Sequence, residues 1–174
     1  RGYFELQDGQ SPASEMTENL SEKVREDFLK FAQPLLGAEK RSLVVNLDWK
    51  NPYYTANARY SEKALIITIW GGFLRAPGMN PSIMAMALCH ELGHLVGGEP
   101  KQTNESGENV TVEGQSDFFA AKNCLVDFYD KHSEYIPKIS NDVHSFCQGS
   151  SQCEQSLESG VQTFLYLQKW SFSA

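Results

Sequence analysis

The sequence has no apolar run close to the roughly 20 residues that a membrane-spanning helix needs. It also has no basic stripe with interleaved aromatic residues, because 15 Lys and Arg are outnumbered by 22 Asp and Glu. The resulting net charge of -7 argues against a nucleic-acid backbone or an anionic membrane surface as partner. We therefore expect a chain without a membrane span that binds no nucleic acid.

Cysteine is scarce, and no two cysteines have the CxxC spacing of a zinc knuckle or a thioredoxin-like motif. The four that occur are an even number, which favours disulfides in an oxidising compartment. Cys147 and Cys153 flank a short loop, and we expect them to pair. Cys89 and Cys124 have two interpretations, either as buried small residues or as a disulfide between two helices. The predicted location is therefore periplasmic or extracellular.

The first 18 residues are polar and lack the basic-then-apolar order of a signal peptide. Because the chain does not start with methionine, we interpret it as processed, with an export signal as one candidate for the removed part. We predict a flexible arm over residues 1–18. A length of 174 residues is typical of one hydrophobic core, so residues 19–174 are expected to form a single domain.

Apolar and β-branched residues concentrate in three short stretches bounded by turn residues, which is typical of strands. These stretches are residues 42–49, Ala56–Tyr60 and Ala64–Trp70. Apolar residues at helical spacing predict four helices. They run from near Ser21 to Pro34, over Pro81–Val96, from a Thr111 cap to about Tyr129, and over residues 154–169. We expect an α+β fold, with a small antiparallel or mixed sheet packed on the two central helices and the terminal helices flanking it.

The helix predicted over Pro81–Val96 has clear signals at both ends. Asn80 is a good N-cap, proline suits the first helical position, and the pair Gly97-Gly98 is typical of a helix end. Residues 98–109 are polar and are expected to form a loop. The last two turns of this helix carry the sequence HELGH.

In HELGH, His90 and His94 are four residues apart, so on a helix both project from one face, one turn apart. That spacing allows two imidazole nitrogens to bind one Zn²⁺ ion at about 2.0–2.1 Å. Glu91 lies about 100° round the helix from His90, which suits it to contact a water on the metal. We expect Glu91 to act as the general base.

Two histidines do not hold a catalytic zinc ion alone, so a third ligand is needed. The metzincin pattern HExxHxxGxxH is not complete here, because Gly97 fits it but Pro100 stands where the third histidine is required. Every methionine precedes His90, so no Met-turn can follow it; they are Met16, Met79, Met84 and Met86. The metzincin interpretation therefore fails.

Glu113 and Asp117 are again four residues apart on a predicted helix. If this helix returns beside the HELGH helix, Glu113 falls opposite His94 and Asp117 opposite His90. Glu113 then completes a His₂Glu site with an open position for water, and Asp117 accepts a hydrogen bond from His90. The alternatives for the third ligand are Asp117 itself, with its shorter side chain, and three glutamates closer to the motif. These are Glu99, Glu105 and Glu108.

HELGH followed by ExxxD resembles the gluzincin group of zinc peptidases, of which thermolysin is the familiar member. The resemblance covers about residues 64–124, and the chain has no large C-terminal helical domain, so it looks like a minimal gluzincin. It implies a metallopeptidase that acts on peptide or protein substrates. It also implies that the zinc ligands are His90, His94 and Glu113, that Glu91 is the general base, and that Asp117 accepts a hydrogen bond from His90. It also implies that the strand Ala64–Trp70 forms the upper edge of the cleft and can pair with an extended peptide.

An amide-hydrolysing site also needs a donor that stabilises the transition-state oxyanion. The candidates are Tyr129, His132, Tyr135, His144 and Tyr166. Two other functions stay open for the same metal site. One is a non-catalytic binding module braced by zinc, and the other is a peptidase or amidase acting on cell-wall peptides.

Overall fold

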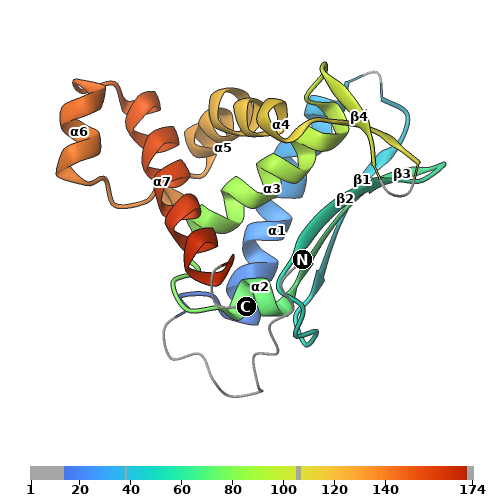
Figure 1. Cartoon of the computed structure of the whole chain (residues 1–174), viewed down its shortest axis with the longest axis horizontal. Helices are drawn as coiled ribbons and strands as arrows, with labels where there is room; N and C mark the ends of the chain where they lie inside the picture. The colour runs from blue at the N-terminus through green and yellow to red at the C-terminus, as the bar shows by residue number, and fades with distance from the viewer. Residues whose placement is uncertain (1–13, 38, 105–106, 172–174) are drawn as a thin grey trace.

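A three-stranded sheet and the helices packed on one of its faces form the body of the protein (Figure 1). The structure is a computed structural model and describes residues 14–37, 39–104 and 107–171. The strands are β1 (Ser42–Asp48), β2 (Ala56–Tyr60) and β3 (Ala64–Trp70), in the order β1-β3-β2. Because β1 runs parallel to β3 and β2 runs antiparallel to it, the sheet is mixed.

The expectation that Ala64–Trp70 forms an edge was wrong, because β3 is the central strand and pairs with a neighbour on each side. Its near-continuous apolar sequence, ALIITIW, is typical of a strand with no exposed edge. The edge strand next to the HELGH helix is β2, whose residues Asn57 and Arg59 are exposed. The sheet therefore presents β2, and not β3, to the cleft.

Helices α1 (Glu18–Ala32) and α3 (Pro81–Val96) cover the sheet face that carries the core. Helix α1 begins three residues before the predicted start, with the Thr17 hydroxyl accepting a hydrogen bond from the Leu20 amide. It ends close to the predicted stop, and η1 (Gln33–Leu36) follows it. Asn80 caps α3 through the Ile83 amide, and the helix ends at Val96, so the predicted helix is confirmed.

The segment after α3 is not the plain loop that was expected. It contains a hairpin of β4 (Lys101–Thr103) and β5 (Asn109–Thr111). Thr111 lies in β5 and does not cap the next helix, because its hydroxyl donates instead to the Gly98 carbonyl at 2.9 Å. Val112 stands at the cap position without a side-chain hydrogen bond.

The next helix is one continuous helical run made of α4 (Glu113–Phe119), η2 (Ala120–Cys124) and α5 (Leu125–Lys131). Its middle part, η2, is a π-helix, a form that occurs mostly as single-turn insertions in α-helices. A disulfide joins Cys124 in η2 to Cys89 in α3. Of the two interpretations of these cysteines, the bond between helices is therefore confirmed.

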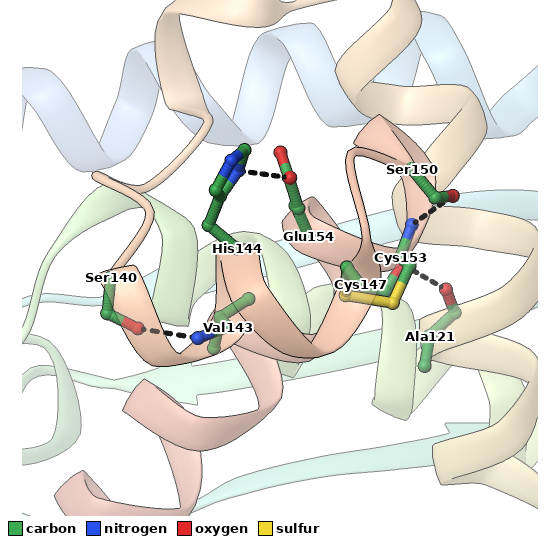
Figure 2. The surroundings of a disulfide bond; sticks show 9 residues. Ala121, Ser140, Val143, His144, Cys147, Ser150, Cys153 and Glu154 are labelled. Atoms are coloured by element: carbon green, nitrogen blue, oxygen red, sulfur yellow. Dashed lines mark hydrogen bonds and ion pairs between the residues drawn. A yellow bond between two sulfur atoms is a disulfide. The ribbon is translucent and has the colours of Figure 1, made fainter.

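The C-terminal part consists of α6 (Asn141–Cys147) and α7 (Ser151–Ser171), which the predicted disulfide Cys147–Cys153 joins. Beside this bond, His144 Nδ1 lies 2.7 Å from Glu154 Oε1 (Figure 2). Helix α7 packs on the side of α3 that faces away from the sheet (Figure 1). Two short helices, α2 (Gly71–Arg75) and η3 (Ser133–Tyr135), complete the fold.

The observed fold is α+β with a small mixed sheet, as predicted. The sheet was expected to pack on both central helices, but α1 packs on it beside α3, whereas α4 packs chiefly on α3. Within the described residues, no helix combines the length and the apolar character that crossing a bilayer requires. Residues 1–13 of the predicted arm lie outside the described residues. Residues 14–16 pack on the domain, since Met16 is buried and the Glu15 amide donates to the Met79 carbonyl at 2.9 Å.

Candidate metal centre

The two histidines of HELGH project from the same face of α3. Their rings meet edge to face with centroids 4.7 Å apart, and His90 Nε2 lies 3.0 Å from His94 Nε2. Helical spacing explains this arrangement, because residues four apart stand one above the other. Both rings are largely shielded from solvent, with side chains 22% and 12% exposed.

Glu113, the first residue of α4, brings a carboxylate to the same point. Its Oε2 atom lies 3.1 Å from His90 Nε2 and 3.4 Å from His94 Nε2. Asp117, one turn further along α4, places Oδ1 2.8 Å from His90 Nδ1. The structure thus brings together the four residues that the sequence predicted as metal ligands and supporting group.

The hydrogen bonds of the two Nδ1 atoms determine which ring nitrogens carry protons. His94 Nδ1 lies 2.8 Å from the Thr111 carbonyl, which can only accept, so His94 donates from Nδ1. His90 likewise donates from Nδ1 to the Asp117 carboxylate. In the neutral rings, both Nε2 atoms then present lone pairs toward one another and toward Glu113. Three such electron donors at 3.0–3.4 Å repel one another unless a cation lies between them.

These distances fit a zinc ion. Ligand atoms about 2.0–2.1 Å from a tetrahedral ion are about 3.3–3.4 Å apart, close to the spacing observed for His90, His94 and Glu113. Two imidazoles and one carboxylate are a common ligand set for zinc with an open fourth position. The Nδ1 bonds to Asp117 and to the Thr111 carbonyl are the outer-shell contacts that orient metal-binding histidines.

The charges around the cluster favour a cation. Burial lowers the pKa of His90, but hydrogen bonds to Asp117 and Glu113 outweigh it and raise this pKa to about 10. The hydrogen bond from His90 lowers the pKa of Glu113, so this carboxyl is ionised near neutral pH. Without a metal, the cluster therefore retains a proton between its ligand atoms.

Glu91 follows His90 on α3. Two cavities lie beside the cluster, and Glu91 lines both of them. Its side chain is almost fully buried, and this burial raises the pKa of the carboxyl to about 7, although the nearby His90 lowers it. A carboxyl with a pKa near the working pH can both take and return a proton. This environment suits the general base that the sequence predicted.

Gly93, inside the HELGH motif, was not singled out from the sequence but determines how closely α4 approaches α3. A β-carbon at Gly93 would lie 2.9 Å from the Ser116 Cα and from the Ser116 carbonyl oxygen, closer than real β-carbons come. Ser116 also places its hydroxyl 3.1 Å from His94 Nδ1. A glycine in a helix interior is unfavourable by about 1 kcal/mol relative to alanine. Its occurrence inside the predicted helix was the sequence signal that could have indicated this close contact.

A cleft of about 680 Å³ opens at the cluster. Strand β2 forms one wall and the β4–β5 hairpin forms the other, with His90, Glu91, His94 and Glu113 between them. At the end of β2, the Tyr60 amide donates to Glu108 Oε1 of the hairpin at 2.9 Å. Glu108 thereby ties the two walls of the cleft together.

The hydrogen bonds of β2 define which backbone groups face the cleft. The Trp70 amide donates to the Thr55 carbonyl, and the Ser61 amide donates to the Ala64 carbonyl. The odd-numbered residues along β2, such as Thr55 and Ser61 at its two ends, therefore hydrogen-bond toward β3. Successive residues of a strand alternate in direction. The amide and carbonyl groups of Ala56 and Ala58 therefore point away from β3, as the Tyr60 amide does, toward the open edge.

The rival third ligands do not join the cluster. Glu108 is engaged with the Tyr60 amide and with Asn104, whose side-chain nitrogen donates to Oε2 at 3.0 Å. Glu99 is exposed beyond the end of α3 and does not line the cleft. Glu105 lies outside the described residues. Asp117 occupies the supporting position at His90 Nδ1.

Neither cavity at the cluster is lined by any of the five oxyanion-donor candidates. The hydroxyl of Tyr129 is buried in a hydrogen-bond network with Ser82 and Ser159. Tyr166 is buried and donates to the Phe73 carbonyl. The remaining three belong to other clusters; they are His132, Tyr135 and His144.

A second group of potential metal ligands occurs among the described residues, where Asp27, His132 and Glu134 place ligand atoms within 4.8 Å of one another. This group already contains a cation. Lys23 Nζ lies 2.9 Å from Asp27 Oδ2 and 3.4 Å from Glu134 Oε1, and it donates to the Tyr135 hydroxyl at 2.7 Å. We interpret this group as an ion-pair network that fastens α1 to η3.

Comparison of the chain with protein-family models, with curated proteins and with solved structures gives no match.

Proposed function

We propose that the protein is a zinc-dependent metallopeptidase of the gluzincin type, with a zincin-like arrangement of its two central helices. The observation that carries the proposal is the convergence of His90 Nε2, His94 Nε2 and a Glu113 oxygen within 3.0–3.4 Å. A purely structural zinc site is normally closed by four protein ligands, whereas three ligands beside an open cleft leave a position for water.

When bound, zinc lowers the pKa of a coordinated water to about 7 and polarises the scissile carbonyl. Glu91, buried beside the ligands, takes a proton from the attacking water and passes it to the leaving amine. Asp117 holds His90 with its Nε2 lone pair turned toward the metal position. The Thr111 carbonyl does the same for His94.

The substrate class follows from β2. An extended peptide can add to the open edge of a sheet through backbone hydrogen bonds, which depend little on sequence. Ala56 and Ala58 offer their amide and carbonyl groups along one wall of the cleft, and their small side chains leave room beside the cluster. We infer that a peptide or an extended segment of a protein binds along β2. The two disulfides support an exported protein.

The test begins with metal content. Purified protein is dialysed against zinc and analysed for metal, and a mixture of denatured protein and short peptides is then digested and read by mass spectrometry. We expect one zinc per chain and peptide cleavage by the wild type. The Glu91→Gln variant should retain zinc but lose at least about a hundredfold in rate, the range of a general base.

Glu99→Gln is the matched control, because Glu99 is an exposed glutamate outside the cleft. Its zinc content and rate should equal those of the wild type. If zinc binds but neither wild type nor variant cleaves any peptide, the metal only braces the two helices. If Glu91→Gln cleaves as fast as the wild type, the assigned mechanism is wrong.

A further inference from the structure

Helices α6 and α7 carry an apolar groove of about 570 Å³ at the end of the molecule that lies away from the sheet (Figure 1). We call it the α7 groove, because most of the residues that line it belong to this helix. It is formed chiefly by Phe146 of α6 and by Leu157, Gly160, Val161, Phe164 and Leu165 of α7. Among the described residues that line the groove, none carries a charge, so a partner is held there by apolar contact.

Four apolar side chains of the α7 groove stand out into solvent. Phe146 is 75% exposed, Phe164 60%, Leu165 58% and Val161 39%. Together they expose about 400 Å² in one copy of the chain, if a whole aromatic side chain has about 200 Å². Single exposed apolar residues are normal in a folded protein, but a contiguous apolar patch of several hundred Å² is often an interaction surface.

The exposed stripe on α7 has the spacing of a helix that packs along another helix. Leu157, Val161 and Phe164 follow one another at distances of four and three residues, which places them on one side of the helix. Other residues fasten α7 to the domain, such as Ser159 and Tyr166, which are buried. The stripe is therefore a second apolar side of α7, and its shape suits a helical partner.

The two halves of the groove along α7 differ in shape. The first half is recessed, because Ser156 and Leu157 are partly buried and Gly160 has no side chain. An added β-carbon at Gly160 would find nothing within 4 Å. The second half protrudes, because Phe164 and Leu165 are more than half exposed. A partner that fits this groove therefore has a protruding part opposite the first half and a recessed part opposite the second.

A second copy of α7 has this shape when it runs antiparallel to the first. With a twofold axis between Gly160 and Val161, Phe164 of each copy lies opposite Leu157 of the other, because both residues are equally far from the axis. Protruding side chains then fill recessed positions at both ends of the contact. A parallel pair would instead set Phe164 against Phe164 and leave the two hollows at Gly160 facing each other.

We propose that the α7 groove is the interface of a twofold-symmetric dimer, in which the α7 helices of two copies of the chain pack antiparallel. This inference goes beyond the peptidase function and does not depend on it. Burial of the four exposed side chains in both copies removes about 800 Å² of apolar surface from water, which is below the 1,200 Å² or so of a standard interface. The dimer is therefore a weak one, with dissociation in the micromolar range.

Charge distinguishes this partner from a basic one. Each copy has a net charge of -7, so two copies repel each other at long range, whereas the residues of the groove are uncharged. Salt screens this repulsion, and the dimer should become tighter as ionic strength rises. Because α7 packs on the side of α3 that faces away from the sheet, the cleft beside β2 stays open in the dimer (Figure 1).

The experiment is analytical ultracentrifugation of the full chain, from low micromolar to several hundred micromolar protein and at low and high salt. We expect the mass to rise with concentration from that of one chain to that of two. Phe164→Glu should raise the dissociation constant at least about tenfold, because each carboxylate would be buried against apolar side chains. Leu35→Glu is the matched control, since Leu35 is an exposed apolar residue of η1 outside the groove. It should dimerise as the wild type does.

A mixture of two variants tests both the identity of the partner and the antiparallel alignment. Phe164→Glu and Leu157→Lys should each dimerise poorly alone. In an antiparallel pair of one copy of each, the new glutamate lies opposite the new lysine, and the unchanged Leu157 lies opposite the unchanged Phe164. The mixture should therefore dimerise at least about tenfold more tightly than either variant alone. Circular dichroism and thermal unfolding establish that both variants fold.

Each contrary outcome has a definite meaning. A wild type that stays monomeric at every concentration overturns the dimer. A dimer that Phe164→Glu leaves unchanged, or that Leu35→Glu weakens equally, overturns the α7 groove as its interface. A mixture no tighter than its components overturns the antiparallel alignment, and a dimer that weakens with salt contradicts an apolar contact. None of these measurements depends on zinc or on cleavage, so the peptidase proposal stands or falls separately.

Discussion

Gly93 of α3 and Ser116 of α4 are in direct contact, and no side chain could stand between them. A β-carbon at position 93 would lie 2.9 Å from the Ser116 Cα and 2.9 Å from its carbonyl oxygen. Glu113 and Asp117 lie on either side of Ser116 in the sequence, so this contact controls how far both carboxylates stand from the histidines. The glycine in HELGH therefore affects the geometry of the candidate metal site without being one of its ligands.

Gly93→Ala should push α4 away from α3. We expect a loss of about 1–3 kcal/mol in stability from overpacking and a zinc affinity lower by about 10–100-fold. Thermal unfolding and competition with a zinc chelator measure the two effects. Gly160→Ala is the control, because nothing lies within 4 Å of an added β-carbon there and alanine favours the helix. An unchanged zinc affinity in Gly93→Ala would show that the helix contact does not control the ligand geometry.

The ligand assignment predicts graded losses of zinc affinity. Glu113→Ala removes a ligand atom and should abolish stoichiometric binding at micromolar zinc. Asp117→Ala removes only the acceptor for His90 Nδ1 and should weaken binding by about 10–100-fold, as expected of an outer-shell group. Equal losses in both variants, or full occupancy without Glu113, would contradict the assigned ligand set. Both affinities are read from chelator competition.

The two disulfides should contribute unequally to the free energy of unfolding. In the chain-entropy description, a cross-link between residues 35 apart contributes about 4 kcal/mol, whereas one between residues 6 apart contributes about 2 kcal/mol. The double variant Cys89→Ala/Cys124→Ala should therefore lose more stability than Cys147→Ala/Cys153→Ala. It should also lose zinc affinity, because Cys89 precedes His90 and Cys124 follows Asp117 by two turns. Urea denaturation and zinc titration of both pairs compare them directly.

The Asp27 network should make stability depend on pH. Burial raises the pKa of Asp27, but the hydrogen bonds from Lys23 and Tyr135 outweigh it and lower the pKa below its usual value. Because this pKa is lower in the folded state, the ionised carboxyl stabilises the fold at pH values above the unfolded-state pKa of about 3.9. This stability is lost as the pH falls through the folded-state pKa. Asp27→Asn should lower Tm at pH 7 by roughly 2–8 °C, from a loss of about 1–2 kcal/mol.

The gap in Tm between wild type and Asp27→Asn should close as pH falls below about 4, where the wild-type carboxylate gains its proton. A pH-independent difference would mean that the effect comes from packing and not from charge. Zinc affinity should stay unchanged in this variant, since Asp27 belongs to the second cluster and not to the HELGH site.

Local signals in the sequence were enough to predict the helix that carries HELGH. The cap at Asn80, the glycines after Val96 and the four-residue spacing of the histidines all act within a few turns of one helix. The pairing of Glu113 with His94 and of Asp117 with His90 was also predicted, because two antiparallel helices bring positions of equal spacing together. These inferences depend on helical periodicity, which short-range geometry sets.

Other parts of the site depend on contacts between distant segments. Sequence reasoning placed β3 at the edge, but strand order is a property of the whole sheet and put β2 there. The partner of His94 Nδ1 is a backbone carbonyl, at Thr111, and any residue type supplies one, so the sequence holds no sign of it. The second cavity beside Glu91 is lined by Met86 of α3 and Leu167 of α7, which are 81 positions apart, and no local pattern encodes their contact with one cavity.

By itself, therefore, the sequence determined the chemical groups of the candidate centre and their spacing along each helix, because side chains four residues apart on a helix must share a face. Only the tertiary structure decided which strand edge, which carbonyl and which apolar side chains surround those groups. The reason is physical: these neighbours are selected by the packing of the whole core, in which each contact depends on all the others.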